Sequence, residues 1–227
     1  MSENYFILAG GIGNRLQCLD IPKALAPIPS KNGMESILDR IIRLRGIGQY
    51  VLCLGWHAQL FNERYTNLER FITYDVDNPT GAAMAVKMIL EHYNCHRYVI
   101  LLGDVVWSKR AMDEFKTHTT DKDIVFYHDK HRGYSETFAL SIHHNAKDSI
   151  IQALSVDTLP SLPGERRQYG FIDTPIDRVR LGGLEKVIVD NHWSNYKRIY
   201  TTHSVDDIDT DEQYKQVIVN LLGGLYG

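Results

Sequence analysis

The sequence predicts an α/β fold: a mainly parallel mixed sheet with helices on both faces, in a single domain. In the first half, short apolar runs alternate with segments whose apolar residues recur at helical spacing, which is typical of strand–helix–strand units. The run YVILL at 98–102 is the strongest strand signal. With 227 residues, of which 44% are hydrophobic and 23% charged, the chain is long enough for one domain with its own core.

These patterns place the elements in order along the chain. Strands are expected at 5–9, 50–54, 70–74 and 98–102, and helices at 34–46, 57–66 and 80–93. In the second half, strands are expected at 124–127, 137–142 and 184–189, and a C-terminal helix is predicted by the apolar stripe of Tyr214, Val217, Ile218, Leu221 and Leu222. Residues 157–182 are rich in Pro, Gly, Arg and Asp and receive no assignment.

Composition and charge argue against several classes of protein. A formal net charge of −3 gives no support to nucleic-acid binding through a basic face. No run of about 20 apolar residues predicts a membrane span, and the first residues lack the basic stretch of a secretory signal. The three cysteines, Cys18, Cys53 and Cys95, fit a reducing compartment better than a disulfide framework or a zinc site. We therefore expect a cytoplasmic protein without nucleic-acid or membrane partners, and leave a homo-oligomer open.

A glycine-rich segment, Leu8-Ala-Gly-Gly-Ile-Gly-Asn-Arg-Leu16, directly follows the first strand. Gly10, Gly11 and Gly13 allow positive φ and close backbone approach, and successive N–H groups in such a loop bind phosphates. Leu16 occupies the place of the third glycine of the dinucleotide fingerprint, and the Lys-Ser/Thr pair of a P-loop is absent. Arg15 could grip two phosphate oxygens. The alternative is a tight turn with an exposed arginine.

Two further charged residues follow in the first half. Lys23, in Ile21-Pro-Lys-Ala-Leu25, could meet the same phosphate, or it could be a solvated surface residue. Asp104 comes directly after the buried strand 98–102, at the carboxyl edge where open α/β sheets bind ligands. A carboxylate there suits Mg²⁺, which takes one or two protein carboxylates together with substrate phosphates. The alternative is ordinary Gly-Asp turn chemistry.

An acidic segment, Val205-Asp-Asp-Ile-Asp-Thr-Asp-Glu212, precedes the C-terminal helix. Thr210-x-x-Gln213 fits a capping box, and acids in a first helical turn complement the helix dipole. Helix capping alone can therefore explain the segment. Asp209 could also complete a metal site with Asp104.

Taken in order, these segments resemble the nucleotidyltransferase superfamily, whose signature is L-A-G-G-x-G-[TS]-R-L followed by P-K. The resemblance includes Asn78-Pro-Thr-Gly-Ala-Ala83, Val99 to Asp104, and Asp207-Ile-Asp-Thr-Asp-Glu-Gln-Tyr214; it is clear over 5–107 and 205–222 and faint between them. The length suits compact members such as hexose or heptose 1-phosphate nucleotidyltransferases and phosphocholine cytidylyltransferases. Asn14 and Gln213 depart from the usual residues, and Asp173 or Asp207 competes with Asp209 as second metal ligand.

The resemblance implies a Rossmann-like fold of the GT-A type, with one domain over 1–227. It implies an Mg²⁺-dependent transfer of a nucleoside monophosphate from an NTP to a small phosphorylated acceptor, with release of pyrophosphate. Residues 1–107 and 205–222 would carry the nucleotide and metal, and 108–204 the acceptor. The implied roles are Arg15 and Lys23 on the phosphates, Leu8, Ala9, Gly10, Gly11, Gly13, Asn14, Asn78 and Gly81 on the nucleotide, and Asp104 and Asp209 on Mg²⁺.

Two other functions stay open at this stage. A glycosyltransferase of related fold would use a D-x-D pair after a strand; Asp104 is followed by Val105 and Val106, although Asp207-x-Asp209 has that spacing elsewhere. A non-catalytic nucleotide-binding module is the second alternative. Outside these motifs, His92 and His96 are interpreted as a polar helix end without a third metal ligand, and the pair His143-His144 as surface residues or acceptor-site lining.

Overall fold

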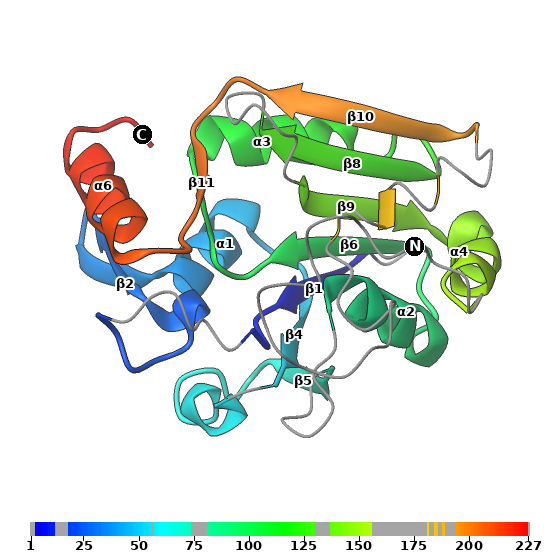
Figure 1. Ribbon diagram of the computed structural model, residues 1–227, viewed down its shortest axis with the longest axis horizontal. Helices are drawn as coiled ribbons and strands as arrows, with labels where there is room; N and C mark the ends of the chain where they lie inside the picture. Colours follow the sequence, from blue (N-terminus) through cyan, green and yellow to red (C-terminus); the bar gives the residue numbers. More distant parts are fainter. Residues whose placement is uncertain are drawn as a thin grey trace, which may run out of the picture.

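A seven-stranded mixed sheet lies at the centre of the molecule (Figure 1), with the strand order β10-β8-β9-β6-β1-β4-β5. Its strands are β1 (Glu3–Leu8), β4 (Gln49–Leu54), β5 (Glu69–Ile72), β6 (Arg97–Leu102), β8 (Ile124–Asp129), β9 (Thr137–His143) and β10 (Tyr196–Thr201). The computed structural model describes residues 3–11, 18–55, 57–73, 81–129, 137–155 and 194–226, together with Leu181, Leu184, Glu185 and Ile188.

The sheet is mainly parallel, as predicted. β9 pairs antiparallel with β6 and with β8, whereas the other four pairings are parallel. All strands except β9 therefore end at the same edge of the sheet, which we call the carboxyl edge; the opposite edge is the amino edge. The chain segments that follow six strands are brought together at the carboxyl edge.

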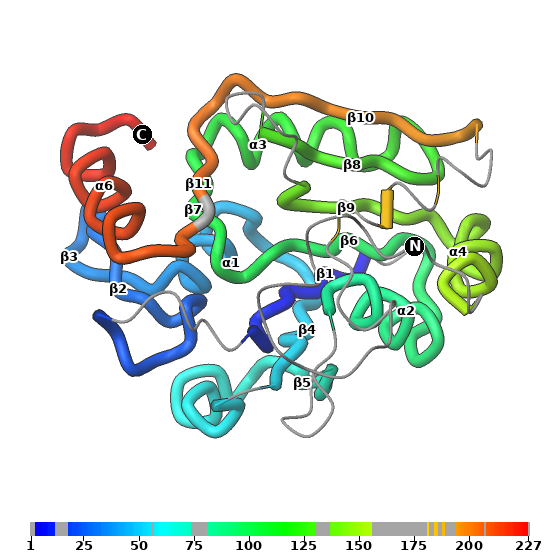
Figure 2. Tube along the Cα trace, in the orientation of Figure 1, coloured from blue at the N-terminus to red at the C-terminus, as the bar shows by residue number. Residues whose placement is uncertain are grey.

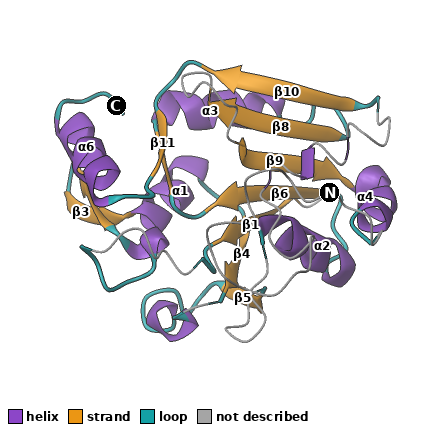
Figure 3. Cartoon of the chain, viewed as in Figure 1, coloured by secondary structure: helices purple, strands orange, loops and turns teal. Residues whose placement is uncertain are grey.

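Helices cover both faces of the sheet, because side chains along each buried strand alternate between two cores. Tyr5 and Ile7 belong to one core with α1 (Ile37–Arg45) and α3 (Lys109–His118). Phe6 belongs to the other core, with α2 (Ala82–His92) and α4 (Lys147–Ala153). Figure 3 shows these helices packed around the sheet. No helix among the described residues is long and apolar enough to cross a membrane.

Two separate two-stranded sheets lie on the side of α1. A hairpin is formed by β2 (Pro27–Ser30) and β3 (Gly33–Ser36), and an antiparallel ribbon by β7 (Val105–Trp107) and β11 (Val205–Asp207). The C-terminal α6 (Asp211–Leu222) lies beside β2 in Figure 2. The Tyr214 hydroxyl of α6 donates to the Pro27 carbonyl at 2.5 Å. Three 3-10 helices complete the described elements: η1 (Lys23–Leu25), η2 (Ala58–Phe61) and η3 (His144–Ala146).

Three sequence predictions need correction. The helix expected over 34–46 begins only at Ile37, because Ser36 caps it in a capping box with Asp39, and the preceding residues form β3. The helix expected over 57–66 is reduced to the 3-10 turn η2. The strand expected over 184–189 is wrong: the described residues Leu184, Glu185 and Ile188 are helical, and the i, i+4 pair Leu184 and Ile188 is buried in the core of α2 and α4.

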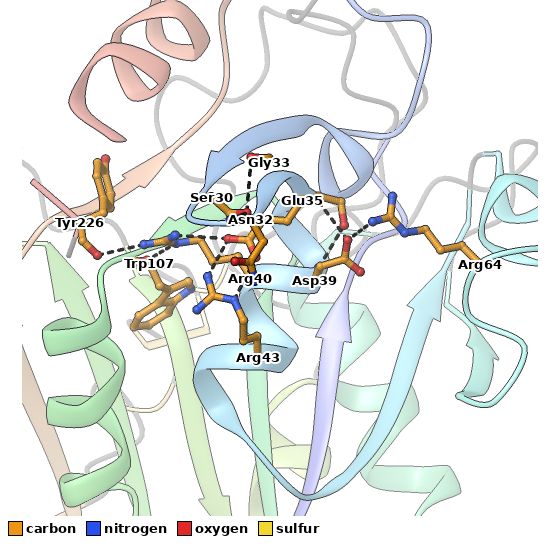
Figure 4. A network of polar contacts seen from close by, with 11 residues as sticks. Ser30, Asn32, Gly33, Glu35, Asp39, Arg40, Arg43, Arg64, Trp107 and Tyr226 are labelled. Atoms are coloured by element: carbon orange, nitrogen blue, oxygen red, sulfur yellow. Dashed lines mark hydrogen bonds and ion pairs between the residues drawn. The ribbon is translucent and has the colours of Figure 1, made fainter. Parts of the chain in front are cut away.

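A buried guanidinium joins α1 to both the β7–β11 ribbon and the C-terminus (Figure 4). Arg40 donates from Nε to the Trp107 carbonyl at 2.7 Å and from Nη2 to the Tyr226 carbonyl at 3.0 Å. Its Nη1 lies 3.3 Å from Glu35, which also binds Arg43. Burial lowers the pKa of Arg40, and the nearby Glu35 carboxylate opposes this effect. The charge is compensated and its donors are satisfied, so it can stay buried.

We expect Arg40→Met to lower the free energy of unfolding by about 3 kcal/mol, because two buried carbonyls and Glu35 lose a charged donor. Arg43→Ala is the matched control: it removes a partner of the same Glu35, but its side chain is 53% exposed, and the expected cost is below about 1 kcal/mol. Urea unfolding followed by circular dichroism measures both. Equal losses would show that the buried network contributes no more than a surface ion pair.

Candidate active site

At the carboxyl edge, the residues at the start of the glycine loop lie against the residues that follow β6. β1 and β6 pair in register from Glu3↔Arg97 to Leu8↔Leu102, so both strands end together. The Gly103 amide then donates to the Leu8 carbonyl at 2.9 Å, and the Ala9 amide to the Cys53 carbonyl at 2.9 Å. This backbone pairing places Leu8 and Ala9 directly beside Gly103 and Asp104.

Two glycines are needed here because backbones approach closely. A Cβ on Gly103 would lie 2.9 Å from the Leu8 carbonyl oxygen, and one on Gly10 would lie 3.1 Å from the Gly55 nitrogen. Of the two reasons expected for the glycines of the loop, close backbone approach applies to Gly10. Positive φ does not apply to Gly10 or Gly11: among the described glycines it occurs at Gly33, Gly46 and Gly224. A Cβ on Gly11 would meet no described atom within 4 Å, so packing does not require a glycine at that position.

Lys23 reaches this edge from the start of η1. Pro22 supplies the extended residue before the turn, and its carbonyl accepts from the Leu25 amide at 2.8 Å. After the turn, the Ala26 amide donates to the Lys23 carbonyl, and the Ala26 carbonyl accepts from the Ile37 amide at 3.2 Å. These two hydrogen bonds fix η1 against the start of α1. The Lys23 side chain is only 10% exposed. It is therefore a buried cation and not the solvated surface residue of the alternative interpretation.

Asp209 is positioned by the β7–β11 ribbon and by the cap of α6. Asp207 pairs with Val105, and the Ile208 amide donates to the Asp104 carbonyl at 3.3 Å. The Gln213 side-chain oxygen accepts from the Asp209 amide at 2.8 Å and from the Thr210 amide at 2.9 Å. Thr210 in turn accepts from the Gln213 amide, which confirms the predicted capping box.

The three groups converge on one point. Lys23 Nζ lies 2.5 Å from Asp209 Oδ1 and 3.5 Å from Asp104 Oδ2, with side chains 15% and 32% exposed for Asp209 and Asp104. Two carboxylates so close together repel each other, and the ammonium between them removes that repulsion. Carboxylate oxygens are the ligands that Mg²⁺ prefers, and both already face a shared cation. The donor set therefore fits a hard divalent cation.

The remaining predicted site residues have different outcomes. Gly81 is the N-cap of α2, which is the next element along the chain after β5. The positions of Gly13, Asn14, Arg15, Asn78 and Asp173 lie outside the described residues, as does the side chain of Asp207. The Cys18 amide donates to Asp211 Oδ1 at 3.1 Å, which joins the segment after the glycine loop to the first turn of α6.

Sequence reasoning missed a second group of polar residues near the carboxyl edge. His128, near the end of β8, is fully buried and its Nε2 lies 3.0 Å from Glu185 Oε2. Arg198 of β10 pairs with the other oxygen of Glu185. Burial raises the pKa of Glu185, but hydrogen bonds and charge attraction from His128 and Arg198 outweigh it, and the net pKa is lowered. No local motif signals this cluster, because its members come from separate segments.

The match to a family model defines the protein as a nucleotidyltransferase. The chain matches the MobA-like NTP transferase domain over residues 5–189 and belongs to that family. This confirms the predicted resemblance and the predicted class of enzyme. A search of curated proteins found no significant match.

Solved structures share the fold at low sequence identity. The inositol-1-phosphate CTP transferase from T. maritima superposes with a TM-score of 0.66 at 13% identity, over 98% of this chain and 97% of that one. HddC from Yersinia pseudotuberculosis complexed with GMP-PN gives 0.60 at 16%, over 96% and 99%. Rv0371c from Mycobacterium tuberculosis H37Rv, in complex with manganese, gives 0.60 at 14%, over 96% and 98%. The predicted fold class is confirmed.

We expect Gly103→Ala to destabilise the fold by about 1–3 kcal/mol, because the new Cβ would press on the Leu8 carbonyl and the Ala9 methyl group. Gly11→Ala, two residues beyond Ala9, should stay within about 0.5 kcal/mol of the parent, since it meets open space. Chemical denaturation compares the two variants. A Gly103→Ala protein as stable as Gly11→Ala would contradict the close backbone contact.

The lowered pKa of Glu185 predicts a pH-dependent contribution to stability. A depressed carboxyl pKa stabilises the folded state above the unfolded-state value of about 4.3, and the stabilisation is lost as the pH falls through the folded-state pKa. Glu185→Gln should therefore cost about 2 kcal/mol at pH 7, and this cost should shrink as the pH falls below the unfolded-state value and through the lowered folded-state pKa. Urea unfolding across this range measures the difference, with the exposed Glu91→Gln as control. A pH-independent difference would count against the ion cluster.

Proposed function

We propose that this chain is an Mg²⁺-dependent nucleotidyltransferase that joins the nucleoside monophosphate of an NTP to a small phosphorylated acceptor and releases pyrophosphate. The observation that carries the proposal is the convergence of Lys23, Asp104 and Asp209 at the carboxyl edge, beside the loop that begins at Ala9. The family supports the reaction class. The choice of metal and of acceptor is our inference from the chemistry of the residues.

Asp104 and Asp209 would hold the divalent cation. When bound, Mg²⁺ neutralises charge on the phosphate oxygens around the reacting phosphorus. The ammonium of Lys23 lies between the two carboxylates, and its flexible stem would allow it to reach a phosphate next to them. Rv0371c, which shares the fold, has been solved with manganese, which supports a divalent metal in proteins of this fold.

The glycine loop would hold the polyphosphate. Gly10 is packed against the backbone of Gly55, whereas Gly11 is exposed and has open space on its Cβ side, so the loop offers a backbone surface that a phosphate can approach. We assign the β- and γ-phosphates to the backbone from Gly10 to Gly13 and to Asn14 and Arg15. HddC, which shares the fold, has been solved in complex with GMP-PN, which supports nucleotide binding by proteins of this fold.

In this reaction the protein would position the two substrates and neutralise their charge, and it would not need to form a covalent bond to either of them. An oxygen of the acceptor phosphate attacks the α-phosphorus in line with the departing pyrophosphate. Lys23 would donate to the phosphate oxygens on which charge increases during the transfer, and Arg15 would hold the leaving group. Leu8, Ala9, Asn78 and Gly81 would contact the base and ribose.

The acceptor would lie toward β8 and β10, which end at the same edge as β6. Asp129 and Thr201 close these two strands in register with one another, and both are buried. We assign residues 108–204 to the acceptor and residues 1–107 and 205–222 to the nucleotide and metal. The inositol-1-phosphate CTP transferase shares the fold, which supports sugar 1-phosphates, polyol phosphates and phosphocholine as the compounds to test.

Asp104→Asn should abolish turnover while the fold is retained, because the metal loses one carboxylate ligand. Lys23→Ala should lower kcat on the order of 10²-fold, the scale for removal of one preorganised charged group. Pyrophosphate release with four NTPs and a panel of phosphorylated acceptors measures both effects. Removal of Mg²⁺ with a chelator should stop the reaction, and added Mg²⁺ should restore it.

Asp113→Asn is the matched control, because Asp113 is an exposed residue of α3 that pairs with Lys109 and Lys116. It should retain parental turnover. Undiminished pyrophosphate release by Asp104→Asn would overturn the metal assignment. Nucleotide binding without turnover over the whole panel would favour a binding module over an enzyme.

A further inference from the structure

Three histidines gather at the amino edge, away from the proposed nucleotide site. His96 precedes β6, His143 ends β9 and His144 begins η3. Asp104 follows the other end of β6, so the six residues of that strand separate the two places by about 20 Å. None of the three histidines takes part in the proposed transfer reaction. The sequence pattern had instead grouped His96 with His92.

The three ring nitrogens are close enough to share one ion. One ligand nitrogen from each ring lies within 4.8 Å of the other two, and His143 Nε2 lies 3.1 Å from His96 Nε2. Zinc binds imidazole at about 2.0–2.1 Å, and two ligands of a tetrahedral zinc are then about 3.3 Å apart. The spacing between His96 and His143 is therefore near that of two ligands on one zinc ion.

Backbone hydrogen bonds hold the three residues in place. The His144 amide donates to the His96 carbonyl at 3.0 Å, and the His143 amide to the Asp123 carbonyl at 2.7 Å. The antiparallel register of β6 and β9 places Arg97 opposite His143. Because the backbone is already held in place, an ion would not have to order it on binding, and this lowers the free-energy cost of binding.

A carboxylate lies behind the central histidine. His143 Nδ1 lies 3.7 Å from Asp123 Oδ1 and accepts a hydrogen bond from the Asn145 amide at 3.3 Å, and the other Asp123 oxygen accepts from Asn195 at 2.6 Å. Asp123 therefore supplies a negative charge beside the histidine ring, which favours a bound cation.

The neighbouring Arg97 guanidinium is directed elsewhere. Arg97 donates from Nη1 to the Thr119 and Lys122 carbonyls and to the Ser141 hydroxyl. Its donors therefore do not compete for the histidine nitrogens. Asp123 opposes its repulsion of a cation.

We propose that His96, His143 and His144 form a binding site for a transition-metal dication, with zinc as the expected ion and water as its fourth ligand. Imidazole ligands select zinc, nickel and copper over Mg²⁺, which prefers oxygen. The site is thus chemically separate from the carboxylates at the other edge. It fixes the end of β9 and η3 to the start of β6.

The first experiment titrates Zn²⁺ alone into the chelator-treated full chain, in excess Mg²⁺ to saturate the carboxylates. Calorimetry should find one tight zinc equivalent per chain. Zinc at about 100 times its Kd should raise Tm by about 5–10 °C. His143→Ala or His144→Ala should weaken binding at least about 10-fold, whereas His118→Ala, outside the cluster, should bind zinc like the parent.

A second measurement needs no variant. Zinc should protect His96, His143 and His144 of the parent protein from diethylpyrocarbonate, read by peptide mass spectrometry, and should leave His118 reactive. Absence of a zinc equivalent, equal modification with and without zinc, or zinc binding that survives loss of all three histidines would overturn the proposal. Loss of the zinc equivalent in Asp104→Asn with retention in the histidine variants would assign the ion to the carboxylates instead.

Discussion

Two carboxylates that face the same lysine set the main constraint on this molecule. Asp104 lies near the middle of the chain and Asp209 lies 105 positions further on, and their mutual repulsion has to be offset by a cation. Lys23 supplies that cation, 186 positions from Asp209 in the sequence. The turn at Pro22 positions Lys23. The β7–β11 ribbon and the Gln213 cap together position Asp209. Several local structures that look unrelated thus serve one electrostatic arrangement.

The same constraint explains why the region around α1 is so polar inside. The ribbon that carries Asp209 can hold its position only if β7 is anchored, and Arg40 anchors it through the Trp107 carbonyl. The same guanidinium binds the Tyr226 carbonyl just beyond α6. A single buried charge therefore joins the helix that supports η1 to both segments next to the carboxylates. Its donors fit carbonyl acceptors that an apolar side chain would leave unsatisfied.

The pattern of apolar residues predicts the strands correctly where both faces of a strand are buried. The parallel strands β1, β4 and β6 are buried on both faces, so their apolar runs are continuous and easily recognised. The prediction failed where a cap interrupts the pattern, as Ser36 does before α1, and at Leu184 and Ile188, which lie in an apolar run that predicted a strand but are helical. Lys23, Asp104 and Asp209 could be predicted from local motifs. The histidine cluster could not, because only the β6–β9 register brings His96 and His143 together across 47 positions.

The two ends of β6 lie next to different kinds of potential metal ligand, carboxylate oxygens at one end and imidazole nitrogens at the other. Its carboxyl end leads to a carboxylate that faces the Lys23 ammonium, and its amino end follows a histidine in a group of three imidazoles. Ligand softness separates the two, since oxygen donors suit Mg²⁺ and imidazole suits zinc. An ion at the amino edge would fix β9, the one antiparallel strand of the sheet, against β6. Because β6 ends directly before Gly103 and Asp104, a more rigid β6–β9 pair would also steady the carboxylate on which the proposed transfer depends.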